Sequence, residues 1–515
     1  MRVAIIGAGF AGVSTARVLA GLNYDVTVFE SEPEVGGVWA ASRRYPGLNT
    51  QNPGCTYYLS ELPMPAEYPE WPTGEQVQQY MEGYVDTFGL RHLFRFNNRV
   101  DSARYDEDAD SWLLRVSRLD TENTEPPTQH RFDMLVIANG IFSRPTIPEF
   151  AGVDEWQAAG GQLLHTSELT DIEAARDKAT LVIGYGKSSC DAATSLADVS
   201  RSTTVVARSI IWKIPRIFSG MLNIKHLLFT RLGEGLFEWQ TLKGFDRFLH
   251  GVGKPIRNMM LGTMQRVIEA QLKLKQLDLL PNKPFESVGR HSISLSTEGF
   301  FEAVEEGKIR VLRETQITEL RPGEAVLSNG EVVPAEFIVA GTSFEQSIPI
   351  LSQDLQDKMT SENGDLRLYR GIVPVDIPKL AFIGYNSTLM CQLSCEASAM
   401  WLAEYLRGGI TVPSKDEMND RIDRRLDYHR NRIDGNYFRG TYLVPFFIRP
   451  VDELLDDIDL NIGRWTRFKQ WLSYVRPSVY AKNHKILAQR AALANPQETE
   501  HLTSNKPEKA VGQAS

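Results

Sequence analysis

The sequence predicts an α/β fold with two Rossmann-like domains, a helical insertion and a helical C-terminal extension. The prediction rests on two glycine-rich loops, which follow short apolar runs at residues 2–6 and 179–183. Each loop is followed by a helical pattern and then by another run rich in β-branched residues, which is the β-α-β order of a parallel sheet. A chain of 515 residues is too long for one hydrophobic core and should form about two to four domains.

The expected elements follow one another in the order that such a fold requires. A Pro- and Gly-rich stretch at 43–72 predicts a structured loop, and two runs at 99–105 and 111–119 predict a pair of strands. The other expected strands lie at 2–6, 25–29, 132–138, 179–183, 203–207, 309–312, 325–328, 336–340 and 380–384. Helices are expected at 11–22, 73–88 and 396–406.

Residues 215–280 depart from this alternation, because Leu, Phe, Met and Trp recur there at helical spacing. This helical insertion either lines or covers a pocket, or it is plain helical core. Beyond residue 415 the chain is charged and helical, and its polar end should be disordered. The expected domains are 1–165 and 336–415 (first domain, in two parts), 166–335 (second domain, with the insertion at about 215–300), 416–495 (extension) and 496–515 (tail).

Composition narrows the class of protein. The net charge of −9 gives no general attraction to nucleic acid or to anionic lipid. The 4 cysteines have neither disulfide density nor zinc-ligand spacing, which favours a reduced, cytoplasmic chain without a metal. The N-terminus lacks the pattern of a signal peptide, and no apolar run reaches the ~18 residues of a transmembrane helix. The sequence leaves a homodimer open.

The first glycine loop has the G-x-G-x-x-G pattern of a dinucleotide site. Gly7 permits a tight turn, Gly9 lets the backbone approach a pyrophosphate, and Gly12 allows the helix to pack closely on its strand. The helix N-terminus offers unpaired N–H groups to the phosphates. Glu30 lies 18 positions past Gly12 (30 − 12), where a carboxylate binds a ribose diol and repels a 2′-phosphate.

The second loop runs from Gly184 to Ser189, which replaces the third glycine and is small enough for close packing. Arg208 lies 19 positions past Ser189 (208 − 189), nearly the offset of Glu30 in the first domain. A guanidinium at this position pairs with a 2′-phosphate in a bidentate manner. The alternative for Arg208 is a solvated surface arginine. We therefore expect the second site to prefer NADP(H).

Two dinucleotide sites of opposite preference imply two cofactors, FAD at the first site and NADPH at the second. Hydride exchange between two nicotinamides serves no purpose, whereas a flavin accepts hydride from NADPH and then reacts with oxygen. The two loops therefore predict a flavin-dependent oxidoreductase.

Further motifs lie between and after the two loops. They are Gly36-Gly37-Val38-Trp39, Tyr45-Pro46-Gly47, Gly184-x-Gly186-x-Ser188-x-x-Asp191, and Gly384 followed by Glu396 in a helix. Together with the first loop, they resemble the class B flavoprotein monooxygenases, which include the flavin-containing and the Baeyer–Villiger monooxygenases. The resemblance covers roughly residues 1–410 apart from the insertion. It implies that reduced FAD captures molecular oxygen as a C4a-(hydro)peroxide and that one oxygen atom enters a small organic substrate.

Three positions depart from the family pattern. His165 follows Phe150-Ala151-Gly152 at a longer interval than in the family, and we expect a linker histidine bonded to backbone. In Ala340-Gly341-Thr342-Ser343-Phe344 the family's Gly and Thr are exchanged and one residue is added. Where Baeyer–Villiger enzymes usually carry an Asp after Y-P-G, this chain has Gln51 with Asn52 adjacent. An amide there favours the flavin-containing monooxygenases, and hence N- or S-oxygenation.

The expected site residues form three sets. Gln51 or Asn52 would face the flavin as an amide donor and are the catalytic candidates, with a capped turn as the alternative. The residues expected at FAD are Gly7, Gly9, Phe10, Ala11, Gly12, Glu30, Gly37, Val38, Trp39, Val100, Asn139 and Gly140. The residues expected at NADPH are Gly184, Gly186, Lys187, Ser188, Ser189, Arg208 and Ser209.

Several alternatives remain at this stage. Baeyer–Villiger oxygenation of a ketone would use the same cofactors. A disulfide reductase needs a CxxC beside the flavin, which the cysteines do not supply, and an intact NADPH loop disfavours a non-catalytic flavin-binding regulator. In the extension, Trp465, Trp471, Tyr474 and Tyr480 lie among basic residues. They are typical either of an interfacial helix on a membrane or of ordinary helix packing.

Overall fold

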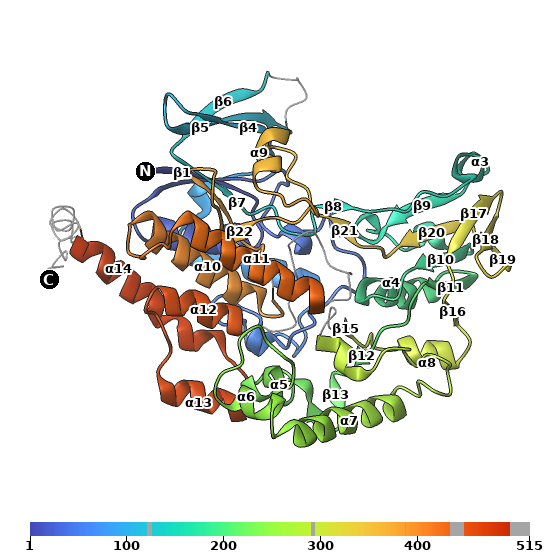
Figure 1. Ribbon diagram of the computed structural model, residues 1–515. Coiled ribbons are helices and arrows are strands. Elements are labelled where there is room, and N and C mark those ends of the chain that lie inside the picture. Colours follow the sequence, from blue (N-terminus) through green and yellow to red (C-terminus); the bar gives the residue numbers. More distant parts are fainter. Residues whose placement is uncertain (121–125, 290–293, 387, 433–447, 495–515) are drawn as a thin grey trace, which may run out of the picture.

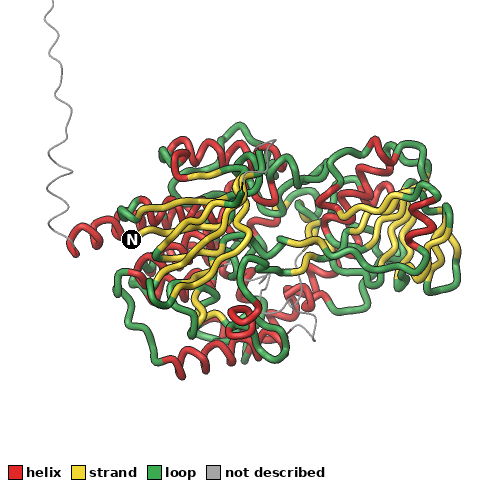
Figure 2. Tube along the Cα trace, turned by 90° about the horizontal axis from the view of Figure 1, so that it is seen from above, coloured by secondary structure: helices red, strands yellow, loops and turns green. Residues whose placement is uncertain are grey.

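The chain folds around two five-stranded parallel sheets, which lie side by side in two lobes (Figure 1, Figure 2). The computed structural model describes residues 1–120, 126–289, 294–386, 388–432 and 448–494. The two sheets confirm the predicted fold class. The tail that was expected to be disordered, 496–515, lies outside the described residues.

The first sheet has the strand order β24-β7-β1-β2-β3, and all neighbours are parallel. Its strands are β1 (Arg2–Ile6), β2 (Asp25–Phe29), β3 (Phe94–Arg95), β7 (Met134–Ile137) and β24 (Leu380–Phe382). Against it pack α1 (Phe10–Ala20) and α10 (Cys391–Leu406), which also pack on each other. α2 (Gly74–Thr87) begins at a capping box formed by Thr73 and Gln76.

The second sheet has the order β16-β11-β10-β20-β9, again with parallel neighbours. Its strands are β9 (Gln162–His165), β10 (Ala179–Ile183), β11 (Ser202–Ala207), β16 (Ile309–Arg313) and β20 (Phe337–Ala340), with α4 (Lys187–Ala197) after β10. The expected limits of this domain, 166–335, are therefore too narrow. β9 and β20 come from the two linkers, and they extend the sheet because the backbone N–H and C=O groups of β10 pair with β20 and those of β20 pair with β9.

Two antiparallel sheets flank the parallel ones. β4 (Asn98–Asp106) and β5 (Ser111–Arg118) pair as expected, and β6 (Thr128–Phe132) joins them, so the expected strand 132–138 is divided between β6 and β7. The other sheet contains β17 (Ile317–Arg321), β18 (Glu324–Leu327) and β19 (Val332–Pro334). The remaining short elements are β8 (Arg144–Pro145), β21 (Phe344–Glu345), β22 (Leu368–Tyr369), β23 (Val373–Pro374), α3 (Val153–Ala158), α8 (Phe300–Glu305) and α9 (Gln353–Lys358).

The insertion packs on the C-terminal extension, and α13 of the extension lies beside α5 and α6 of the insertion at the bottom of Figure 1. The insertion contains β12 (Lys213–Ile214), β13 (Ile217–Phe218), β14 (Leu222–Asn223), α5 (Arg231–Gly235), α6 (Phe245–His250), α7 (Lys254–Gln271) and β15 (Ser294–Leu295). The extension contains α11 (Lys415–Arg432), α12 (Arg449–Asp457), α13 (Arg464–Leu472) and α14 (Lys482–Ala494). Among the described residues, no helix is long and apolar enough to cross a membrane.

Candidate functional site

The first glycine loop is packed so tightly that two of its positions admit only glycine. Gly7 has a φ of 108°, and a Cβ there would lie 2.6 Å from the Ala138 carbonyl oxygen. A Cβ on Gly12 would lie 1.8 Å from the Gly7 carbonyl oxygen. These contacts bring the start of α1 against the end of β1, as the motif predicted.

Gly9, the middle glycine of this loop, faces a second glycine segment instead of a side chain. A Cβ built on Gly9 would lie 3.7 Å from the Gly37 Cα, which is ordinary contact. Gly37 itself has a φ of 57°, and Gly36 N donates to the Ala8 carbonyl oxygen at 3.1 Å. Two bare backbone segments thus meet at the N-terminus of α1, which suits the close approach of a pyrophosphate.

The Glu30 carboxylate lies at the mouth of this loop. Its Oε2 accepts from Ala8 N at 2.6 Å, its Oε1 accepts from Glu32 N at 3.0 Å, and the side chain is buried. Val100 is buried in β4, beside a bulge in that strand, and Asn98 N at the start of the same strand donates to the Glu30 carbonyl oxygen at 2.8 Å. Hydrogen bonds therefore link the first glycine loop, Glu30 and the start of β4.

The remaining expected residues of the first domain fall into buried and exposed positions. Trp39 is buried and its ring packs edge-on against Tyr57 at 5.7 Å, whereas Val38 is exposed. The Asn139 Oδ1 accepts from the Tyr385 hydroxyl at 2.6 Å, and its Nδ2 donates to the Ser347 carbonyl oxygen at 3.1 Å. Asn139 therefore joins the ends of β7 and β24, and Gly140 behind it has a φ of 76°.

The second glycine loop resembles the first, with one compensating change. A Cβ on Gly184, whose φ is 104°, would lie 2.9 Å from the Gly341 carbonyl oxygen. Ser189 is buried, and its hydroxyl donates to that same oxygen at 3.1 Å. A Cβ on Gly341 would lie 2.1 Å from the Ser189 Oγ. The serine in place of the third glycine therefore requires a glycine opposite, which explains the exchanged Gly and Thr at 341 and 342.

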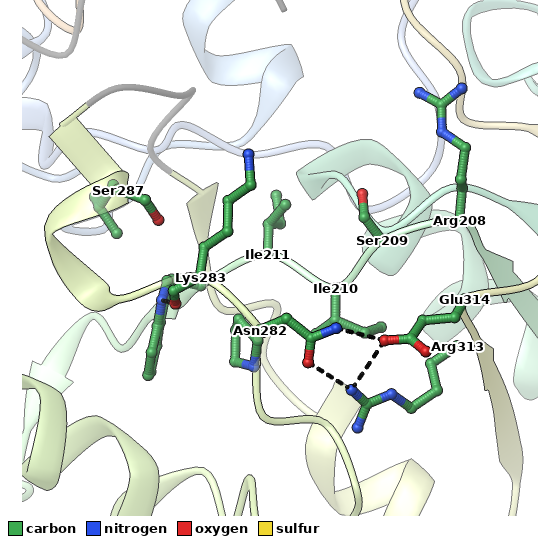
Figure 3. Close-up of a pocket in the computed structure, with 12 residues that line it drawn as sticks. Arg208, Ser209, Ile210, Ile211, Asn282, Lys283, Ser287, Arg313 and Glu314 are labelled. Carbon is green, nitrogen blue, oxygen red and sulfur yellow. Dashed lines mark hydrogen bonds and ion pairs between the residues drawn. The ribbon is translucent and has the colours of Figure 1, made fainter. Parts of the chain in front are cut away.

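Arg208 lies at the edge of a cavity of about 280 Å³ beside the second sheet (Figure 3). Its side chain is exposed and points away from Arg313, which pairs with Asp278 at 2.7 Å. Within the described part of the chain, Arg208 has no ion pair. The other residues that line this cavity include Ser209, Ile210, Trp212, Asn282, Lys283 and Glu314. Sequence reasoning found Arg208 and Ser209 but missed the opposite wall, which comes from the end of the insertion.

Two cations that closely follow Arg208 in sequence do not line this cavity. Lys213 is buried, its Nζ donates to the Ser294 hydroxyl at 2.8 Å, and burial lowers the pKa of its ammonium group. Arg216 pairs with Glu298 at 3.1 Å and donates to the Asn49 side chain. Lys213 therefore joins β12 to β15 within the insertion, and Arg216 connects the insertion to the loop at 43–72 of the first domain.

Lys187, expected at the phosphates of NADPH, forms an ion pair with Asp191 on the next turn of α4. Burial lowers the pKa of Lys187 and, together with the Asp191 charge, raises that of Tyr45 well above its ordinary value. The Tyr45 hydroxyl donates to Asp191 Oδ2 at 3.0 Å, and the Thr297 hydroxyl also donates to this carboxylate. Asp191 thus connects the Tyr45-Pro46-Gly47 turn of the first domain to the second glycine loop.

The two expected catalytic amides face different elements. Asn52 is buried, and its Nδ2 donates to the Leu389 carbonyl oxygen at 2.5 Å, just before α10. Gln51 is half-buried, and its Oε1 accepts from Leu295 N at 3.2 Å, in β15 of the insertion. Gln51 therefore stands between the two domains, whereas the Asn52 amide is engaged within the first domain.

His165 is the linker histidine that the sequence predicted. Its Nδ1 accepts from Ser167 N at 3.1 Å, so its Nε2 donates to the Thr342 carbonyl oxygen at 2.9 Å. The imidazole packs edge-on against Phe344 at 4.7 Å, and burial lowers its pKa. His165 and the altered motif at 340–344 are therefore two halves of one joint between the domains.

The comparisons with known proteins agree with this arrangement. A family model described as "Flavin-binding monooxygenase-like" matches residues 1–461. The chain belongs to this family. Membership confirms the prediction of a flavin-dependent monooxygenase with FAD and NADPH as cofactors.

Two relatives and two solved structures illustrate the similarity. The chain is 24% identical over 507 residues to "Probable flavin-containing monooxygenase 1" of Arabidopsis thaliana, which covers 91% of this chain and 93% of the relative. It is 23% identical over 472 residues to "Flavin-containing monooxygenase 1" of Canis lupus familiaris, with 89% and 83% covered.

Among solved structures, a cyclohexanone monooxygenase bound to ε-caprolactone superposes with a TM-score of 0.65 and 19% identity, covering 89% of this chain and 99% of the other. S-allyl-L-cysteine S-oxygenase from Allium sativum superposes with a TM-score of 0.62 and 18% identity, covering 98% and 97%. At these identities the likeness shows a shared fold, which the S-oxygenase and the cyclohexanone monooxygenase have in common.

Proposed function

We propose that this monooxygenase transfers one oxygen atom to a soft nucleophile, the nitrogen of an amine or the sulfur of a sulfide, in a small organic substrate. The observation that carries the proposal is Gln51, a neutral amide at the domain joint where an acid would favour the Baeyer–Villiger outcome. Gln51 Oε1 accepts from Leu295 N at 3.2 Å, which orients the NH₂ group of the amide as a donor.

FAD is assigned to the first domain. Gly9 and Gly37 would hold its pyrophosphate between bare backbone segments, and Glu30 would bind the ribose diol. The fit rests on the 3.7 Å separation between a Cβ at Gly9 and the Gly37 Cα, which leaves no side chain between the two segments. When bound and reduced, the flavin supplies the chemistry that activates molecular oxygen.

NADPH is assigned to the second domain. Gly186 faces open space, because the nearest atom to a Cβ there is the Ser189 Oγ at 4.0 Å. The peptide N–H groups at the start of α4 point into that space and favour a phosphate. Arg208 and Ser209 would bind the 2′-phosphate at the cavity edge. Lys187 already neutralises Asp191, so it supplies little net positive charge to the pyrophosphate.

Gln51 is the candidate catalytic residue, and its role is to donate a hydrogen bond near the reacting oxygen. A neutral amide adds no positive charge that would favour a deprotonated, nucleophilic oxygen, and its hydrogen bond would hold the reacting oxygen in place and slow its loss as hydrogen peroxide. Oxygen transfer to a ketone needs the deprotonated, nucleophilic form instead. Asn52 is a positioning residue, because its amide holds the loop to the segment before α10.

The experiment is a competition under oxygen between a tertiary amine, a sulfide and a cyclic ketone, with purified enzyme and NADPH. Products are separated by gas chromatography and identified by mass. The proposal predicts N-oxide or sulfoxide and no lactone. Lactone formation from the ketone at a comparable rate would contradict it and favour the Baeyer–Villiger alternative.

A further inference from the structure

One edge of the molecule carries apolar side chains that no described element covers. It is formed by α6, the first half of α7, and α13, which follow one another along the bottom of Figure 1. The exposed side chains are Phe245, Phe248 and Val252 in the insertion, and Trp465, Phe468 and Leu472 in the extension. Val252 is 86% exposed, Trp465 67% and Leu472 77%. We call this surface the apolar edge.

The apolar edge consists of two stripes. Residues 465, 468 and 472 recur at i, i+3 and i+7 in α13, and residues 245 and 248 recur at i and i+3 in α6, so each set lies on one helix face. Val252 is exposed in the turn between α6 and α7. Ile256 and Met259 continue the first stripe along α7 and are also exposed.

Ring contacts join the two stripes. The Phe245 ring packs edge-on against Trp471 of α13 at 5.2 Å and stacks on Phe248 at 5.4 Å. Trp465 stacks on Phe468 at 5.6 Å on the same helix. The insertion and the extension therefore present one shared surface.

The apolar edge is held in place by buried ion pairs beneath it. Arg449 of α12 pairs with Asp246 of α6 at 2.6 Å, and Arg231 of α5 pairs with Asp452 of α12 through two contacts of 2.6 and 2.9 Å. Arg231 Nε also donates to the Gln470 side chain of α13 at 2.8 Å. These ion pairs and this hydrogen bond hold the inner faces of the helices together, and the apolar side chains lie on their outer faces.

The charge around the apolar edge is positive, although the whole chain has a net charge of −9. Between residues 240 and 256 the only acid is Asp246, which is buried and paired with Arg449. Between residues 460 and 494 there is no acid at all. The basic residues in or beside the two stripes are Lys243, Arg247, Lys254, Arg464 and Lys469, together with Arg467, which pairs with Asp452 and Asp456 of α12 at 3.6 and 3.8 Å.

We propose that the apolar edge docks the enzyme on the surface of an anionic lipid bilayer, with the aromatic rings at the depth of the headgroups and the basic side chains on the lipid phosphates. Amphipathic helices with aromatic and aliphatic side chains on one face and Lys and Arg around them bind in this way without spanning the bilayer. The positive charge favours a lipid surface over a second copy of the chain, because two such edges would repel each other. The proposal is independent of which substrate is oxygenated.

Vesicle sedimentation of the full-length enzyme with its cofactors tests this docking. Vesicles of phosphatidylcholine containing phosphatidylserine are compared with vesicles of phosphatidylcholine alone. We expect binding to the anionic vesicles, weakened by added salt. In the double variant Trp465→Ser/Phe468→Ser, and separately in Arg464→Glu/Lys469→Glu, the partition coefficient should fall by roughly tenfold or more. Both pairs are on the surface, so the flavin absorbance and melting temperature should not change.

The matched control is Val332→Ser, which removes an exposed apolar side chain from β19 in the other lobe and should bind like the wild type. Absence of binding to anionic vesicles by the wild type would overturn the proposal, and so would equal binding by the double variants. A dimer in analytical ultracentrifugation that Trp465→Ser/Phe468→Ser abolishes, without vesicle binding, would assign the apolar edge to a second copy instead.

Discussion

Two glycine-to-alanine substitutions, one in each loop, should separate the two cofactor sites. Gly9 and Gly186 precede α1 and α4 with φ values of −78° and −71°, which alanine adopts without strain. The added methyl group meets nothing closer than 3.7 Å at Gly9 or 4.0 Å at Gly186 within the protein. Each variant should therefore fold normally, and any loss must come from the bound dinucleotide.

The expected loss follows from the hydrogen bonds that the methyl group displaces. At these positions a Cβ points into the space where a pyrophosphate would approach the backbone N–H groups. A hydrogen bond to a charged group contributes about 1.5–3 kcal/mol, so losing one or two of them costs about 3 kcal/mol. Since 1.4 kcal/mol is a factor of ten, the Kd of the affected dinucleotide should rise by roughly 100-fold.

The assay reads both cofactors in the same sample. Gly9→Ala should be purified colourless and regain yellow colour only with excess FAD. Gly186→Ala should be yellow, and its flavin should bleach under nitrogen only at greatly raised NADPH. Gly12→Ala is the contrasting variant, because its methyl group would lie 1.8 Å from the Gly7 carbonyl oxygen and should destabilise the protein itself. If Gly9→Ala keeps its flavin while Gly186→Ala loses it, the assignment of the two loops is wrong.

Three further variants test the rest of the account. Arg208→Ala should raise the KM for NADPH by roughly tenfold or more and leave that for NADH unchanged, since a 2′-phosphate contact contributes about 1.5–3 kcal/mol; equal loss with both coenzymes would exclude the contact. Gln51→Ala should keep NADPH oxidation but divert most of it to hydrogen peroxide, measured as the ratio of peroxide to product, and an unchanged ratio would remove Gln51 from the reaction. Burial raises the pKa of Glu234 from 4.5 to about 7. The neutral carboxyl therefore contributes about 3 kcal/mol to the free energy of unfolding below pH 4.5, and this contribution is lost as the pH rises through 7. The free energy of unfolding of Glu234→Gln, measured with denaturant, should therefore rise relative to that of the wild type between pH 5 and 8. A constant difference between the two proteins over this range would show that Glu234 does not titrate there.

The fold and the two dinucleotide loops could be predicted because their determinants are local. Gly7, Gly12 and Gly184 are required by positive φ or by backbone contacts within the β-α turn, and such requirements leave a fixed spacing in the sequence. The local part of the His165 environment, its contact with Ser167 two residues away, is of the same kind, whereas its contact with Thr342 spans 177 positions.

The joint between the domains could not be predicted, because its partners are far apart in sequence. Asp191 accepts from Tyr45 and Thr297, which lie 146 and 106 positions away. Lys187 pairs with Asp191, and from the loop sequence alone it could be assigned only to a phosphate.

Two features left signals that reasoning from the sequence could have used. Ser189 in place of a glycine required a glycine in a facing segment, and Gly341 was already visible as a departure from the family motif. The absence of acids from 460 to 494 marked the basic side of the apolar edge. The buried ion pairs between Arg231 and Asp452 left no such pattern, because they join the insertion to the extension across 221 positions.

The central claim is that the enzyme passes one atom of molecular oxygen to its substrate at the expense of NADPH. It is tested most directly by turnover of an accepted sulfide or amine under ¹⁸O₂, with the product analysed by mass spectrometry and NADPH consumption measured in the same sample. The account predicts one ¹⁸O atom in each product molecule. Product that carries no label, or NADPH oxidation that yields only hydrogen peroxide with every amine, sulfide and ketone offered, would contradict it.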